Sequence, residues 1–147
     1  MPGSYVIDSE RRTVFIRAWG VLTDAEMRAH VEALRSDSRF DSTYGRISDF
    51  REVTTFALSA VVIGEVARAL SSDSPVRRAT IVAGDLAYGL ARMSQLTVDA
   101  PPELSNLFRD LAPAMVWVGL PVTAEWPAGS PHFVVDDSPG PGTPSAS

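Results

Sequence analysis

The chain has 147 residues, of which 45% are hydrophobic and 21% are charged, and its net charge is −5. This length and balance predict one globular domain with a single core. The absence of cysteine excludes disulfides and thiolate chemistry, the absence of lysine excludes Schiff-base chemistry, and the acidic balance argues against nucleic-acid binding.

The first residues, Met1 to Tyr5, lack the basic and then apolar order of a signal peptide. No apolar run approaches the roughly 18 residues that a membrane-spanning helix needs. We therefore expect a cytoplasmic protein without a transmembrane segment.

The first part of the chain predicts two strands and a helix. Residues 4–7 and 13–19 have strand-like composition and flank a polar turn of hairpin length. Thr23 and Glu26 have the spacing of a capping box, in which each side chain can bond the other residue's backbone amide. A helix is therefore expected from this point to about Ser36.

Alternating helices and strands are predicted in the middle of the chain. Strands are expected at residues 45–50, 76–82 and 104–108. Helices are expected at residues 56–70, after Asp85, and after Asp110, with both aspartates as N-caps. This order predicts an α/β fold in which four helices cover a mixed five-stranded sheet.

The composition changes after about residue 120, where proline, glycine and small residues dominate. Such a segment buries too little apolar surface to fold alone. We expect a single domain at residues 1–120 and a largely disordered, flexible tail at 121–147. Within that tail, Pro131–Val135 could form a short strand against the body.

Four segments stand out by their order and spacing: Gly20–Glu26, Ser48–Val53, Arg78–Met93, and Leu107–Leu111 with Ala114 and Trp117. Together they resemble the SpoIIAA-like group of STAS-fold bacterial proteins, also described as STAS/SEC14-like. The resemblance implies a STAS-like fold over about Tyr5 to Leu120 and a role in binding other proteins. The antagonists of anti-sigma factors in this group carry a phosphorylated serine that aligns with Leu58 here, so the resemblance does not extend to that switch.

Asp49 and Arg51 are the first candidate site. Spaced i, i+2 on a strand, they would point the same way and pair. This pair would either fix the turn that follows or form a ligand site at the carboxyl end of a strand.

The start of the second helix is the second candidate site. With Ile63 as the buried centre, Leu58, Val61 and Glu65 fall on the outer face, so two apolar side chains lie where water is expected. Such a patch favours contact with a protein partner or a second copy of the chain, or coverage by the tail. Nearby Ser59, like Thr54 and Thr55 (the hydroxyl residues before the helix), is a phosphorylation candidate but more simply a cap.

Enzymatic features are weak. His30 is expected on a surface face of the first helix and His132 in the tail, without a second histidine at ligand spacing. We therefore expect no enzyme activity, no metal and no cofactor. The favoured function is a cytoplasmic interaction or regulatory module; binding of a small apolar molecule or lipid is the alternative, and an enzyme using Asp49 and Arg51 is a third reading.

Overall fold

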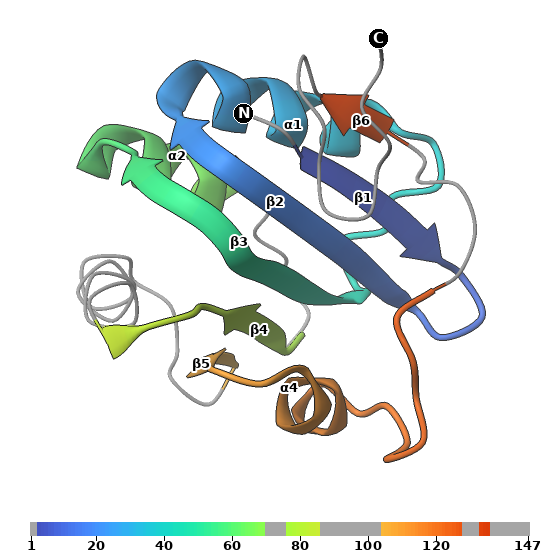
Figure 1. The fold of residues 1–147 in the computed structure, drawn as a ribbon. Helices are drawn as coiled ribbons and strands as arrows, with labels where there is room; N and C mark the ends of the chain where they lie inside the picture. Colours follow the sequence, from blue (N-terminus) through green and yellow to red (C-terminus); the bar gives the residue numbers. More distant parts are fainter. Residues whose placement is uncertain (1–2, 70–75, 86–103, 128–132, 136–147) are drawn as a thin grey trace, which may run out of the picture.

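One twisted mixed sheet organises the part of the chain that the computed structural model describes, residues 3–69, 76–85, 104–127 and 133–135. Six strands of this part lie in the order β5-β4-β3-β2-β1-β6 (Figure 1). They are β1 (Gly3–Asp8), β2 (Thr13–Thr23), β3 (Gly45–Ala57), β4 (Arg78–Ile81), β5 (Ser105–Phe108) and β6 (Phe133–Val135).

The strand directions follow from the connections. β1 and β2 form the predicted antiparallel hairpin, whereas β2, β3, β4 and β5 run parallel to one another. Parallel neighbours require crossover connections, and α1 (Asp24–Ser36) and α2 (Ala60–Ala69) lie in two of them. The five predicted strands are all present, and β6 adds a sixth by pairing antiparallel with β1.

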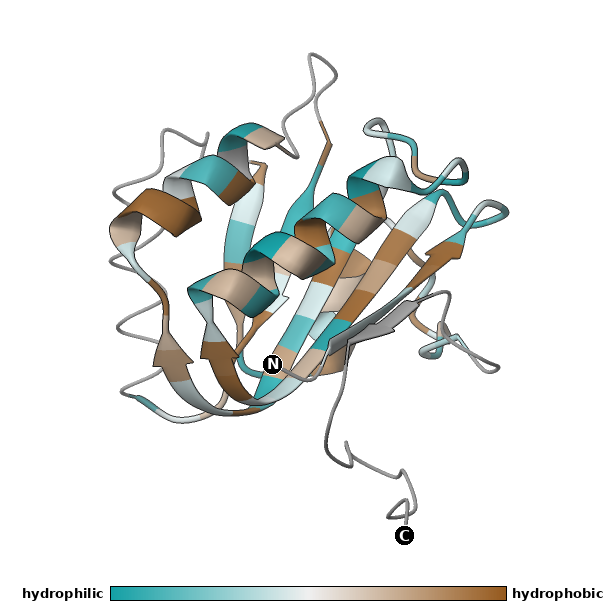
Figure 2. Ribbon diagram, turned by 90° about the horizontal axis from the view of Figure 1, so that it is seen from above, coloured by the Kyte–Doolittle hydropathy of each residue, from teal (hydrophilic) through white to brown (hydrophobic). Residues whose placement is uncertain are grey.

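The helices cover both faces of the sheet. α1 and α2 lie side by side on one face (Figure 2), and α4 (Leu111–Trp117) packs on the other. Thr23 caps α1 as predicted, because its hydroxyl accepts a bond from the Glu26 amide at 3.4 Å. Asp110 occupies the N-cap position of α4, but its side chain makes no capping bond. The helix expected after Asp85 lies outside the described residues.

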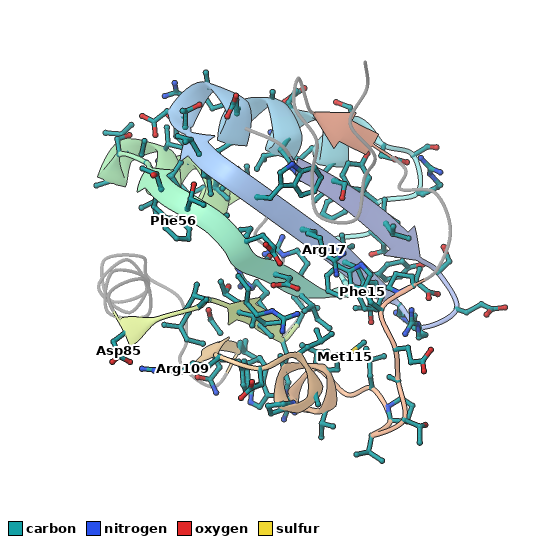
Figure 3. The ribbon with its side chains drawn as sticks, in the orientation of Figure 1. Phe15, Arg17, Phe56, Asp85, Arg109 and Met115 are labelled. Atoms are coloured by element: carbon teal, nitrogen blue, oxygen red, sulfur yellow. The ribbon has the colours of Figure 1, made fainter. Side chains whose placement is uncertain are left out.

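Each face of the sheet carries its own apolar cluster. The face under α1 and α2 buries side chains of β1 and β2 together with Val31 and Leu34 of α1. The face under α4 buries Phe15, Ile47 and Ile81 against Met115 (Figure 3). Strand β2 lies between β3 and β1 and contributes side chains to both faces.

Strand β3 is longer than expected, because it runs through Ala57 and α2 begins only at Ala60. The predicted helix start at residue 56 is therefore wrong. Between the pairs Arg17–Asp49 and Trp19–Glu52, β2 advances two residues and β3 three, and a second shift follows Gly20. These β-bulges break the alternation of side chains by which a strand is recognised. Gly20 has φ 71°, a left-handed conformation that glycine adopts easily.

The segment after Leu120 contacts the body of the molecule where it is described. Trp126 packs edge-on against Phe15, with ring centres 5.1 Å apart, and Arg11 donates a bond of 2.7 Å to the Glu125 carbonyl. Residues 133–135 pair with β1. The pairing of residues 133–135 agrees with the short strand expected at Pro131–Val135, whereas the contacts of Glu125 and Trp126 differ from the expectation of a largely disordered tail. The boundary at residue 120 stays a prediction.

Candidate functional site

Asp49 is at the centre of a charged cluster on the face of the sheet that carries α4. Its side chain is buried, at 4% exposure, and Arg51 donates to it from Nε at 2.9 Å, from Nη2 at 2.8 Å and from its backbone amide at 3.1 Å. The predicted pair is therefore confirmed. A two-pronged guanidinium contact of this kind fixes orientation as well as charge.

Arg17 of β2 is the third member of this cluster. Its guanidinium lies 3.9 Å from the Asp49 carboxylate and stacks on Trp126, with Cζ 4.7 Å from the ring centre. Burial raises the pKa of Asp49, but the hydrogen bonds from Arg51 and the charges of Arg51 and Arg17 lower it further, so it stays below its usual range. Asp49 is thus held ionised, which suits a structural anchor and not a general acid.

The β-bulge explains how Asp49 and Arg51 meet. The extra residue in β3 falls between Asp49 and Glu52, opposite the single residue Ala18 of β2. Bulges reorient side chains locally. Arg51 therefore folds back onto the carboxylate, while its side chain keeps 37% exposure to solvent. Through Arg17, the Asp49–Arg51 pair links β2 to β3. The pair lies within β3, although a turn was expected after residue 50.

The start of α2 is the other predicted site, and its hydroxyl is a cap. The Ser59 hydroxyl accepts from the Val62 amide at 3.2 Å, and the Ser59 amide donates to the Asp24 carboxylate at 2.8 Å. Thr54 and Thr55 instead lie exposed on β3.

Only part of the predicted outer face of α2 is exposed. Val61 is 64% exposed, as expected, while Leu58 is half-buried against Ala18 and Leu22. The buried centre of the helix is Val62, at 0% exposure, and not Ile63, so the predicted helical phase was wrong by one residue.

Glu65 is engaged with α1. Arg28 donates to its two carboxylate oxygens from Nε at 3.0 Å and from Nη2 at 3.3 Å. This ion pair is exposed, so its contribution to stability is small. Its geometry nevertheless fixes the side chain of Glu65 toward α1.

His30 is buried and not on a surface face as expected. Its ring is 4% exposed and lies 5.7 Å from the ring of Tyr5. Burial lowers its pKa from 6.5 to about 4, so it is neutral near pH 7. The described residues contain no group of three or more side chains positioned to hold a metal ion.

Sequence reasoning missed Arg17, and it did not place Trp126 against Phe15. An arginine between the buried residues Ile16 and Ala18 is an unusual strand residue, and this was the available signal. Trp126 lies in a segment whose composition indicated disorder, and nothing local indicates its contact with Phe15.

The fold agrees with that of a solved structure. The crystal structure of an uncharacterised protein of the DUF3478 family with a SpoIIAA-like fold, from Shewanella loihica PV-4, matches at a TM-score of 0.54 and 18% identity, over 79% of this chain and 93% of that one. No family model and no curated protein matches the sequence. The chain therefore has a SpoIIAA-like, STAS-type fold, as the resemblance implied. None of the helices in the described residues is long and apolar enough to cross a bilayer.

Proposed function

We propose that this chain is a STAS-type interaction module that binds a protein partner through the first turn of α2. The observation that supports this most directly is Val61, which leaves an apolar side chain 64% exposed immediately before the fully buried Val62. Ala60, the residue before it, and Ala57, the last residue of β3, are also exposed. A small apolar surface at the start of a helix suits a contact with another protein.

The surroundings of Val61 are held in place before any partner arrives. Asp24 of α1 binds the Ser59 amide, Ser59 caps the helix, and Arg28 joins Glu65. Because these contacts order the first turns of α2 in the free protein, less conformational entropy is lost on binding. Phosphorylation is not part of the proposal, since Leu58 occupies the aligned position.

A charge at Val61 tests the proposal. We expect Val61→Glu to abolish partner binding and to leave the circular dichroism spectrum and Tm close to those of the wild type, because the side chain is already in water. The control is Val122→Glu, the same substitution at a valine that is 83% exposed, on the segment after α4. Both variants and the wild type should be purified from the host and compared by native mass spectrometry.

Each outcome of this comparison supports or contradicts a particular function. A partner that is bound to the wild type and to Val122→Glu, and is lost from Val61→Glu, supports the proposal. A dimer that is lost in the same way assigns the surface to a second copy. A small apolar molecule bound equally to all three proteins supports the alternative, a lipid or small-molecule binder. Loss of binding in both variants contradicts a role for this surface.

A further inference from the structure

The face of the sheet under α1 and α2 changes character between β2 and β3. On β1 and β2 this face is apolar and buried. On the three following strands, the residues that alternate with the buried Ile47, Asp49, Ala79 and Ile81 are mostly polar. The polar residues on this face are Arg46 and Ser48 of β3, Arg78 and Thr80 of β4, and Ser105 of β5.

The strand register places these side chains in two rows. Arg46 pairs with Arg78, which in turn pairs with Ser105, and Ser48 pairs with Thr80 one step further along the strands. Facing positions on neighbouring strands lie about 5 Å apart, so the two guanidinium groups and three hydroxyl groups occupy one patch. All five residues are neither fully buried nor fully exposed.

Two like charges side by side in partly buried surroundings are unfavourable without a counter-charge. Burial, and then the charge of Arg78, lower the pKa of Arg46 to about 9, and burial lowers the pKa of Arg78. Arg46 and Ser105 each take part in further interactions. Arg78 is the side chain that can donate a further hydrogen bond to a ligand. Its Nε is buried without a hydrogen-bond partner, and none of the ion pairs among the described residues includes it.

We propose that the patch formed by Arg46, Ser48, Arg78, Thr80 and Ser105 binds a phosphate group. Arg78 supplies its free Nε–H and the rest of its guanidinium fork, Arg46 supplies the second positive charge, and the hydroxyls of Ser48 and Thr80 donate from the neighbouring row. Guanidinium forks match the oxygen geometry of phosphate. A phosphate group has three terminal oxygens, so it can accept hydrogen bonds from more of these donors than a carboxylate, which has two oxygens.

This site is separate from the surface proposed for protein binding. Arg46 and Arg78 lie near the amino-terminal ends of β3 and β4, whereas Val61 follows the carboxyl end of β3. Loss of one function therefore does not require loss of the other, and the two are tested independently.

Titration calorimetry with inorganic phosphate tests the site. The ionic strength is held constant with chloride, so that general screening does not differ between samples. We expect the wild type to bind, and Arg78→Gln to bind at least about tenfold more weakly, because hydrogen bonds to a charged group are lost. Arg35→Gln, which removes the same charge from an exposed position on α1, should bind like the wild type.

Further titrants identify the ligand class. Glycerol 3-phosphate binding as well as inorganic phosphate assigns a phosphate ester, whereas binding of inorganic phosphate alone assigns the free ion. Acetate binding as well as phosphate contradicts a phosphate site. No binding by the wild type, or equal binding by Arg78→Gln, overturns the proposal.

A spectroscopic measurement covers the case in which Arg78→Gln does not fold. Arg78→Lys keeps the positive charge but lacks the Nε–H group. An arginine Nε–H signal that appears in the nitrogen–proton correlation spectrum of the wild type and is absent from that of Arg78→Lys therefore belongs to Arg78. We expect that signal to move in the wild type as phosphate is added. A signal that stays in place up to millimolar phosphate contradicts the proposal.

Discussion

Trp126 is expected to contribute substantially to stability although it lies in a segment whose composition indicates disorder. Replacing it with alanine removes the edge-on contact with Phe15, worth about 0.5–1.5 kcal/mol, and the stacking of Arg17, worth about 0.5–1 kcal/mol. It also uncovers part of Phe15, which is 1% exposed. We expect Trp126→Ala to lower the free energy of unfolding by about 2–3 kcal/mol.

For a chain of this length, that loss corresponds to a fall in Tm of roughly 5–10 °C, measured by circular dichroism. Val122→Ala is the control, because Val122 is 83% exposed in the same segment and its truncation should leave Tm unchanged. Removal of residues 121–147 should destabilise at least as much as Trp126→Ala, since the pairing of β6 is lost as well. Equal melting temperatures for Trp126→Ala, Val122→Ala and the wild type would refute the reasoning.

Three further predictions follow from single residues. Arg51→Ala should lower the free energy of unfolding by about 1.5–3 kcal/mol, because buried Asp49 loses its charged donor; a fully stable variant that loses a ligand would instead indicate a binding role. Because burial lowers the pKa of His30 from 6.5 to about 4, the unfolded chain takes up a proton that the folded chain excludes. Stability should therefore be complete above pH 6.5 and fall by about 3 kcal/mol as the pH drops to about 4, and urea unfolding should show a smaller fall in His30→Gln. Gly20→Ala should cost about 1–2 kcal/mol in the same assay, because φ 71° is strained for alanine, and an unchanged midpoint would contradict this.

The features predicted correctly from the sequence depend on residues close together in the chain. The β1–β2 hairpin, the Thr23 cap and the Asp49–Arg51 pair each involve neighbours within a few positions. Local hydrogen bonding and turn length are enough to specify them. The alternation of elements then indicated the fold class, because parallel strands require helical crossovers.

The errors arose where packing decides between equivalent local patterns. Val61, Val62 and Ile63 are three consecutive apolar residues, so the sequence leaves open which one faces the interior. In the folded chain it is Val62 that is fully buried. The end of β3 was missed because its first bulge places Phe50 and Arg51 where an alternating pattern expects one residue. The contact of Trp126 with Phe15 joins distant segments and has no local signal.

The pairing of β6 with β1 has a consequence for how the molecule is made. β1 is synthesised well before β6, yet one of its edges acquires a partner only when residues 133–135 have left the ribosome. Until then the hairpin of β1 and β2 carries an uncovered backbone edge, the kind of edge along which chains associate wrongly. Closing so long a loop is also entropically costly. The stage of synthesis before residues 133–135 emerge should therefore be prone to aggregation, and chains interrupted before residue 133 should be less soluble than chains that include it.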